Sequence, residues 1–183
     1  MTKYISILRG INVGGKRKIL MADLRELYQF LGFENVLTYI QSGNVIFESK
    51  RKNKNNAFTK KIKDAIFEKY GFDVPVIIRS VEEIKSIAEN HPFGKKEGVQ
   101  IENLCLTFLS EVPTEENLEK INTYDYSPDL FQIIEDNVFI FIEGKYHQSK
   151  LTNNFFEKKL KVSATTRNWK TVNKLLALST SEK

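Results

Sequence analysis

The sequence contains few of the residues that form disulfides or bind metals. Its single cysteine, Cys105, excludes a disulfide within the chain, so we expect a cytoplasmic protein. Its two histidines, His91 and His147, have no second histidine or cysteine at a metal-ligand spacing. We therefore predict no metal and no other cofactor. Because Cys105 lies in the apolar run LCLTFL, we interpret it as a core residue.

Long apolar runs are missing as well. No run approaches the roughly 18 residues that a membrane-spanning helix needs, and the N-terminus, MTKYISILRG, lacks the apolar core and cleavage site of a secretory signal. With 41% hydrophobic and 28% charged residues, the chain has an ordinary globular composition. The sequence therefore predicts a soluble protein without a membrane partner, and its 183 residues allow one domain or two small lobes.

Charge is distributed unevenly along the chain. Residues 1–80 contain 15 Lys and Arg against 7 Asp and Glu, residues 81–143 contain 4 against 14, and residues 144–183 contain 9 against 2. The two basic ends could form a cationic surface for an anionic ligand, or they could pair with the acidic middle inside the fold. The polar run at 50–56, KRKNKNN, predicts a solvated loop.

The apolar pattern predicts the order βαββαβ for residues 1–80, the N-terminal lobe. Leucines at three- and four-residue spacing indicate the first helix, and Gly32 and Gly71 mark the ends of the two helices. Runs rich in β-branched residues indicate the strands, two of which form a hairpin that turns at residues 42–43. The predicted elements are a strand at 4–9, a helix at 20–31, a hairpin at 36–49, a helix at 58–70 and a strand at 74–79.

A similar order, βαββα(β), is predicted for residues 103–183, the C-terminal lobe with its closing helix. Residues 81–102 are predicted to be a linking helix and loop, because Ser80 and Glu83 make a capping box and the helix stops at residues 91–92. The predicted elements of the C-terminal lobe are a strand at 104–109, a helix opening at 113–115, a hairpin at 130–143, a helix at 155–160, a short run at 161–166 and a closing helix at 169–176.

We predict an α+β fold of two ferredoxin-like lobes. Each lobe is a split βαβ unit, in which two helices cover one face of an antiparallel sheet. The repeated order of elements favours an internal duplication. Residue identity between the two halves is weak, so this interpretation rests on element order alone.

A glycine-rich loop, GINVGGKR at residues 10–17, is the most distinctive functional motif. It fits the phosphate-binding pattern G-x-x-x-x-G-K-[ST] except at Arg17, which replaces the hydroxyl residue that would ligate magnesium. A hairpin follows the first helix, whereas the loop of a nucleoside triphosphatase belongs to a parallel sheet. We therefore predict that the loop does not hydrolyse ATP.

Two interpretations of this loop stay open. Its glycines could simply permit a sharp connection between strand and helix. Four cations crowd the same loop beside a helix start, however, and this favours anion binding. The hairpin turn QSGN at 41–44 supplies further donors, although local side-chain to backbone bonding also explains such residues. We expect the loop and the turn to converge. The four cations are Arg9, Lys16, Arg17 and Lys18.

Near the C-terminus, ATTRNWKTVNKLL at 164–176 places further cations at a predicted helix start, where an anion or a carboxylate would relieve the positive charge. Thr165 and Thr166 are the predicted caps. Trp169 is interpreted as a core residue rather than as a platform for base stacking, because it is in register with Val172 and Leu176. The candidate ligand-binding residues are Arg9, Asn12, Gly14, Gly15, Lys16, Gln41, Ser42, Asn44, Thr166, Arg167 and Asn168.

Four blocks of the sequence, RGINVGGKRKILMADL, TYIQSGNVIFES, SKLTNNFFEKKL and ATTRNWKTVNKL, resemble those of the bacterial protein family called domain of unknown function 1697. The resemblance covers nearly the whole chain and implies two similar α+β lobes related by duplication. The activity of the family is not established, so the resemblance assigns no catalytic residue. The positions that it implies the family keeps are Arg9, Gly10, Asn12, Gly14, Gly15, Gln41, Ser42, Gly43, Asn44, Thr166, Arg167, Asn168 and Trp169.

The favoured function is binding of a phosphorylated small molecule at the glycine-rich loop. Nucleic-acid binding is an alternative, which the third strand disfavours because SGNVIFES lacks the paired exposed aromatics of an RNA-recognition sheet. An enzyme acting on a phosphorylated substrate is another, with Ser42, Thr166 or His147 moving protons. A scaffold whose acidic middle contacts a basic partner is a third. The sequence leaves catalysis and oligomeric state open.

Overall fold

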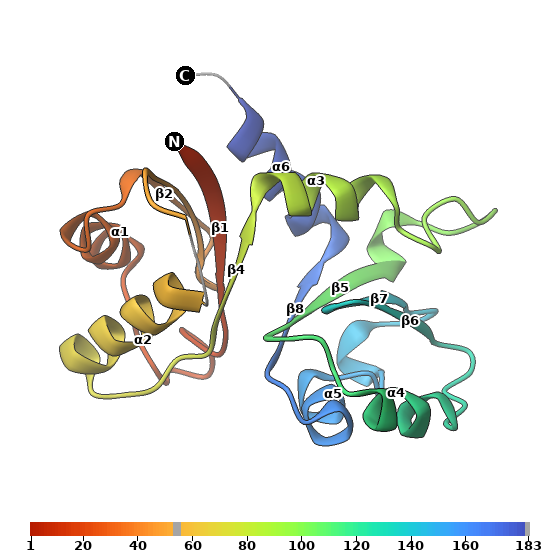
Figure 1. Cartoon of the computed structure of the whole chain (residues 1–183). Helices are drawn as coiled ribbons and strands as arrows, with labels where there is room; N and C mark the ends of the chain where they lie inside the picture. Colours follow the sequence, from red (N-terminus) through yellow and green to blue (C-terminus); the bar gives the residue numbers. More distant parts are fainter. Residues whose placement is uncertain (53–55, 182–183) are drawn as a thin grey trace. The chain divides into compact units, whose positions relative to one another are not determined.

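The computed structural model describes residues 1–52 and 56–181 of the chain (Figure 1). The chain divides into two compact units. The N-terminal unit comprises Met1–Ser86 and Leu175–Lys183, and the C-terminal unit comprises Ile87–Lys174. The chain passes from one unit to the other within the helices α3 (Val81–Glu89) and α6 (Trp169–Thr180). Residues 53–55, part of the predicted loop at 50–56, lie outside the described residues.

The N-terminal unit is a four-stranded antiparallel sheet with two helices on one face (Figure 1). Its elements are β1 (Thr2–Leu8), α1 (Met21–Phe30), β2 (Glu34–Tyr39), β3 (Asn44–Ser49), α2 (Ala57–Tyr70) and β4 (Val76–Ser80). The strand order is β2-β3-β1-β4. One other strand therefore separates each pair of strands that a helix connects, which is the arrangement of a split βαβ unit.

The core of the N-terminal unit lies between this sheet and the two helices. Leu24 and Tyr28 of α1, Ile62 of α2 and Phe47 of β3 are fully buried in one cluster. The spacing of the helical members follows the period of an amphipathic helix. The Tyr28 hydroxyl shares a hydrogen bond of 2.7 Å with Ser6 Oγ, and burial raises the pKa of Tyr28 well above its ordinary value. The phenol therefore stays protonated and anchors α1 to β1.

The opposite face of the same sheet is also apolar. Ile5 and Ile7 of β1, Ile46 of β3 and Ile77 of β4 are each at most 4% exposed. Burial on both faces explains why the sequence of β1 is a nearly continuous apolar run rather than an alternating one. Sheets that recognise RNA present exposed aromatic residues on such a face. The buried aliphatic side chains therefore argue against RNA binding there.

The C-terminal unit repeats this arrangement. Its elements are β5 (Leu104–Leu109), α4 (Glu115–Asn122), β6 (Leu130–Ile134), β7 (Asn137–Phe141), α5 (Asn153–Leu160) and β8 (Ala164–Asn168), with short 3₁₀ helices at Ile101–Asn103 and Tyr146–Gln148. The antiparallel strand order β6-β7-β5-β8 matches that of the N-terminal unit strand for strand. The predicted α+β fold of two similar lobes with antiparallel sheets is confirmed.

Two residues that the sequence assigned to the core are buried in the C-terminal unit. Cys105 of β5 is 4% exposed and belongs to the cluster between the sheet and its helices. Burial raises the pKa of its thiol to about 11, so the thiol is not ionised at neutral pH. Trp169, the first residue of α6, is 6% exposed. Both core assignments are confirmed.

Equivalent positions in the two units carry the same polar residues. Asn44 begins β3 and Asn137 begins β7, and each is followed by a buried valine. Arg79 and Arg167 both occupy the fourth of the five positions in β4 and β8, and both side chains are buried. These matches at the level of single residues add to the element order as support for an internal duplication.

Most predicted helix ends agree with the structure. α2 ends at Gly71, which has the left-handed φ of 74°. The capping box at the start of α3 is formed, because Ser80 N donates to Glu83 Oε2 at 2.6 Å and Glu83 N donates to Ser80 Oγ at 3.2 Å. Thr114 and Thr152 cap α4 and α5 with one side-chain bond each, accepting from Asn117 N and Phe155 N. Within the described residues, no helix is both long enough and apolar enough to cross a membrane.

Candidate functional site

The basic loop, residues 9–18 between β1 and α1, folds back on itself. Asn12 N donates to Arg17 O at 3.2 Å, and Lys16 N donates to Val13 O at 3.0 Å. Gly14 and Gly15 form the tip of this turn with φ values of 57° and 74°. Two consecutive residues at positive φ are the mark of a tight hairpin turn, which glycine adopts without strain. The loop thus forms a short hairpin-like turn. It differs from a phosphate-binding loop whose residues lead directly into a helix.

Asn12 fixes the base of the basic loop. Its Oδ1 accepts a hydrogen bond from Ile19 N at 2.9 Å, and its Nδ2 donates to Ile19 O at 2.9 Å and to Gln41 O at 3.0 Å. The first two bonds close the loop, and the third connects it to the turn between β2 and β3. Because the side-chain amide is occupied by these bonds, Asn12 positions the loop rather than presenting a donor to a ligand.

The basic loop and the hairpin turn converge, as the sequence predicted. Leu8 N donates to Gly43 O at 2.8 Å. Gly43 has φ 81°, and a Cβ placed there would lie 2.6 Å from Ile11 Cδ1 and 2.9 Å from Leu8 Cβ. Contacts this close leave no room for a side chain. Glycine at position 43 therefore allows the turn to lie directly against the buried side chain of Ile11.

The polar residues of the hairpin turn have mainly local partners. Asn44 is fully buried, and its Nδ2 donates to Tyr39 O at 3.0 Å and to Ser42 Oγ at 3.2 Å. For Asn44, local side-chain to backbone bonding therefore explains the residue. Gln41 is exposed and contributes its backbone carbonyl to the bond with Asn12. The turn therefore holds the loop in place through its backbone carbonyl at Gln41.

The cations of the basic loop are concentrated at its exposed part. Lys16, Arg17 and Lys18 are all exposed, and among the described residues no carboxylate lies within salt-bridge distance of them. Arg17 has φ 47°, and its Nη1 would lie 3.3 Å from a Cβ added to Gly10. Its guanidinium therefore lies over the glycine at the start of the loop. In the sequence, Arg17 stands between the two lysines. The candidate residues did not include Arg17 and Lys18, although their place in one basic run was a signal for them.

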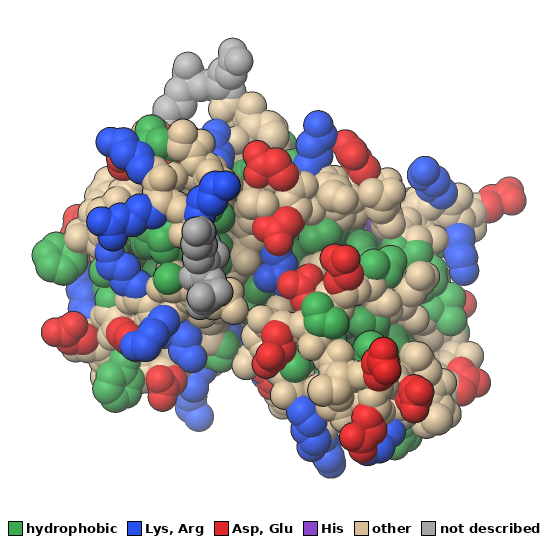
Figure 2. Space-filling model, in the orientation of Figure 1, with side chains coloured by type: hydrophobic (Ala, Val, Ile, Leu, Met, Phe, Trp, Pro, Cys, Tyr) green, Lys and Arg blue, Asp and Glu red, His purple; other side chains and the backbone are tan. Residues whose placement is uncertain are grey.

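Backbone donors accompany these charges. The N–H groups of Gly14 and Gly15 have no acceptor among the residues that the structure describes. Arg9 differs from the three exposed cations, because it is half buried, donates its N–H to Pro75 O at 3.0 Å and has further contacts. The loop therefore offers two amides at its tip, and its exposed residues carry three cationic side chains. Lys and Arg side chains also gather over the N-terminal unit on the face shown in Figure 2.

The candidates near the C-terminus belong to β8 of the C-terminal unit. The prediction that Thr165 and Thr166 cap a helix, with Arg167 in its first turn, is wrong. Residues 164–168 pair with β5, and α6 begins only at Trp169. Asn168 is the residue that caps the helix, because its Oδ1 accepts from Thr171 N at 2.8 Å. Residues 164–168 therefore form a strand beside β5, although their sequence also suits the start of a helix.

The side chains of these candidates are engaged in the fold. Thr166 Oγ1 bonds Thr107 Oγ1 at 2.6 Å and Asn153 Oδ1 at 2.7 Å. Arg167 is 9% exposed, donates from Nη1 to Thr166 O at 2.9 Å, and its burial lowers the pKa of the guanidinium to about 10. The nearby Lys170 pairs with Glu102 at 2.5 Å. The charge of Lys170 at this helix start is therefore paired with a carboxylate of the protein.

Within the part of the chain that the structure describes, neither histidine has a hydrogen bond to Thr166 or Arg167. His147 is exposed in a 3₁₀ helix, whereas His91 is 7% exposed. The His91 ring centroid lies 4.4 Å from that of Trp169, and its Nδ1 accepts from Phe93 N at 3.2 Å. Burial lowers the pKa of His91 to about 4, and a backbone contact with Cys105 offsets part of this effect. Among the described residues, no group of His, Cys, Asp or Glu side chains could hold a metal ion.

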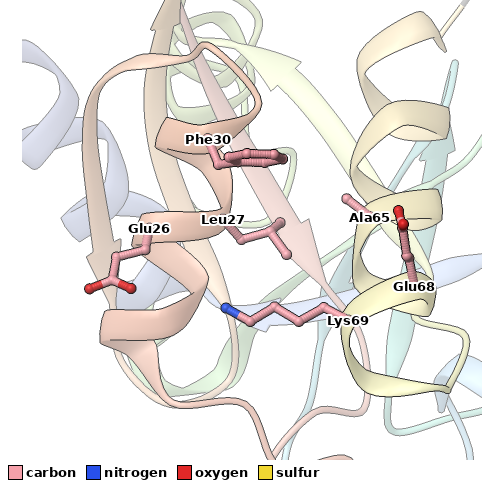
Figure 3. A pocket seen from close by; sticks show the side chains of 6 residues that line it. All are labelled: Glu26, Leu27, Phe30, Ala65, Glu68 and Lys69. Carbon is pink, nitrogen blue, oxygen red and sulfur yellow. The ribbon is translucent and has the colours of Figure 1, made fainter.

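Two cavities share no lining residue with the basic loop. One, of about 370 Å³, is a groove between α1 and α2 (Figure 3). The other, of about 350 Å³, lies in the C-terminal unit. Its lining residues include His91, Trp169 and Leu104, and the buried Nε2 of His91 has no hydrogen-bond partner among the described residues. Neither cavity contains a residue of the predicted site.

Comparison with known proteins identifies a family. The model of a family described as "Protein of unknown function (DUF1697)" matches residues 1–139. A search of curated proteins gives no match. A solved structure, that of the conserved bacterial protein SP0830 from Streptococcus pneumoniae, is similar with a TM-score of 0.70 and 26% sequence identity, covering 97% of this chain and 98% of that one.

Proposed function

The chain belongs to the DUF1697 family, and we propose that it binds a phosphorylated small molecule at the tip of the basic loop. The observation that carries this proposal is the combination of uncompensated charge and free amides. Lys16, Arg17 and Lys18 have no carboxylate partner among the described residues, and the N–H groups of Gly14 and Gly15 point to no acceptor within the same part of the chain. A phosphate group carries several strong acceptors and negative charge, and it satisfies both needs.

The rest of the charge distribution supports this interpretation. Some other lysines of the N-terminal unit have acidic partners, as Lys3 has Glu48 at 3.7 Å and Lys60 has Asp64 at 2.7 Å. Lys63 of α2 has none among the described residues, so the clustering of three such cations is what distinguishes the loop. Three neighbouring cations without such partners repel one another, and an external anion removes this repulsion. Asn12 holds the base of the loop, so binding an anion requires little ordering of the backbone.

A phosphate site of this kind suits binding better than hydrolysis of ATP. Arg17 stands where a triphosphatase has a magnesium-ligating hydroxyl residue. Five residues separate Gly15 from the start of α1 at Met21, so the free amides of the turn and those of the helix start belong to different parts of the chain. Residues 10–17 therefore resemble a triphosphatase loop in sequence but form a separate turn. The cytoplasmic location predicted from the single cysteine is part of the same proposal.

The first test follows the backbone amides of the loop by two-dimensional NMR during titration with glucose 6-phosphate. The expected result is a saturable shift of the Gly14 and Gly15 signals, which unphosphorylated glucose does not cause. Lys16→Glu should abolish the shift. Lys63→Glu, the same charge reversal on α2, is the matched control and should preserve it. Absence of any shift in the native protein, or equal loss in both variants, would overturn the proposal.

A second measurement separates a small phosphate ester from nucleic acid. Affinity for a 12-nucleotide single-stranded RNA should be no greater than for glucose 6-phosphate, because the sheet face of the unit is buried. A polynucleotide bound through many phosphates would show a steep fall of affinity with salt. Tight, steeply salt-dependent RNA binding that Lys16→Glu removes would replace the small ligand by nucleic acid at the same loop.

A further inference from the structure

The groove between α1 and α2 combines an exposed aromatic ring with an adjacent apolar slot. We propose that it is a self-association surface, at which a second copy of the chain binds. The groove has a volume of about 370 Å³ and lies in the N-terminal unit. Its lining residues are Glu26, Leu27 and Phe30 of α1 and Ala65, Glu68 and Lys69 of α2 (Figure 3).

Phe30, the last residue of α1, is the aromatic anchor of this surface. Its side chain is 90% exposed, although most phenylalanines of a globular protein are buried. In Figure 3 the ring lies over the space between the two helices. Aromatic side chains in such positions supply much of the binding energy of protein interfaces. An exposed ring beside an empty slot therefore indicates a surface that a partner covers.

Apolar side chains of both helices line the slot beside Phe30. Leu27 is 5% exposed and belongs to the core cluster, and Ala65 packs partly against the same cluster. The small side chain of Ala65 leaves room between the helices for an incoming ring. Phe30 and the slot thus form a projection and a recess within one patch. A patch that contains both is self-complementary about a two-fold axis, as the interface of a symmetric dimer requires.

The charges around the groove favour a second copy over a partner of one charge sign. Glu26 and Glu68 are acidic, whereas Lys69 is basic and its side chain extends from α2 toward α1 in Figure 3. A strongly basic or strongly acidic peptide would meet repulsion from one of these groups. In the proposed two-fold dimer, Lys69 of each copy would pair with Glu26 or Glu68 of the other. The same patch therefore supplies both partners of each ion pair.

Analytical ultracentrifugation of the full chain over a range of concentrations tests this proposal. The native protein should show a reversible equilibrium between monomer and dimer. Phe30→Ser should raise the dissociation constant at least about tenfold, and because the residue is exposed the variant should fold normally. Phe67→Ser is the matched control, since Phe67 is a 53% exposed phenylalanine of α2 that does not line the groove. It should leave the equilibrium unchanged.

A charge variant gives an independent readout of the same surface. Lys69→Glu places a third carboxylate at the groove and should weaken the dimer, and added salt should restore part of the affinity. A monomer at every concentration would overturn the proposal, as would a dimer that neither Phe30→Ser nor Lys69→Glu weakens. The groove shares no residue with the basic loop, so phosphate binding and dimer formation can fail separately.

Discussion

Asn12 determines the shape of the basic loop through a single side chain. Its three hydrogen bonds close the loop at Ile19 and connect it to Gln41. The residue has φ 57°, a conformation that asparagine tolerates better than most residues. The sequence predicted that Asn12 belongs to the site, but it could not show that the side chain faces inward. That depends on a contact with a turn almost thirty residues away.

Gly43 is the residue at which the structure tolerates least change. An alanine Cβ would approach Ile11 Cδ1 to 2.6 Å at a positive φ, so Gly43→Ala should lower the free energy of unfolding by about 3 kcal/mol. Gly15→Ala is the matched control. Its φ is 74°, but nothing lies within 4 Å of the added Cβ, so the cost should be about 1 kcal/mol. Urea denaturation of both variants measures the difference, and equal costs would contradict the close approach of loop and turn.

His91 should make stability depend on pH. Its pKa is about 4 in the native protein, below its ordinary value of 6.5. Between pH 6.5 and pH 4 the unfolded chain therefore binds a proton that the native protein excludes. The free energy of unfolding should fall as pH decreases through this window, by up to about 3 kcal/mol. Above pH 6.5 the effect of His91 should be absent.

Urea denaturation at pH 7, 6 and 5 measures this dependence. In His91→Phe the fall between pH 6.5 and pH 5 should be smaller, because no group at position 91 titrates. His147→Gln, at the other histidine of the chain, is the matched control because that side chain is exposed. If the free energy of unfolding falls equally with decreasing pH in His91→Phe and in the native protein, a group other than His91 causes the fall.

At the scale of elements, local signals predicted the helix ends well and one strand poorly. Gly71 and the pair of Ser80 and Glu83 act through contacts within a few residues, so the sequence alone reveals them. Residues 164–168 contain threonines that suit a helix cap and equally suit a strand. Their pairing with β5, about sixty residues earlier, decides between the two. The same pairing places Arg167 in a strand, which local reasoning did not reveal.

The capping box of α3 allows a closely matched comparison. Glu82 and Glu83 are both exposed and lie in the first turn of α3, so each interacts with the helix dipole. Only Glu83 also accepts from Ser80 N and Ser80 Oγ, at 2.6 and 2.7 Å. Glu83→Ala should therefore cost about 1 kcal/mol of stability, and Glu82→Ala clearly less. Thermal denaturation distinguishes them, and the reverse order would exclude a stabilising capping box.

At the scale of the whole molecule, the repeated element order was visible in the sequence because it depends on apolar periodicity. The strand orders β2-β3-β1-β4 and β6-β7-β5-β8 follow from that order and the rules of split βαβ units. The equivalence of Asn44 with Asn137, and of Arg79 with Arg167, became clear only when strand register aligned the two units. Single matching residues in otherwise dissimilar halves cannot be recognised without that alignment.

The position of Trp169 gives the molecule a built-in optical probe. It is the only tryptophan of the chain, and its buried ring lies 4.4 Å from that of His91 in the C-terminal unit. Emission excited at long wavelength therefore reports on the surroundings of Trp169 in this unit, whereas circular dichroism reports on the helices of both. Coincident midpoints would show that the two halves melt as one cooperative system. Separate midpoints would show that the two units unfold independently, and no fluorescent label would be needed.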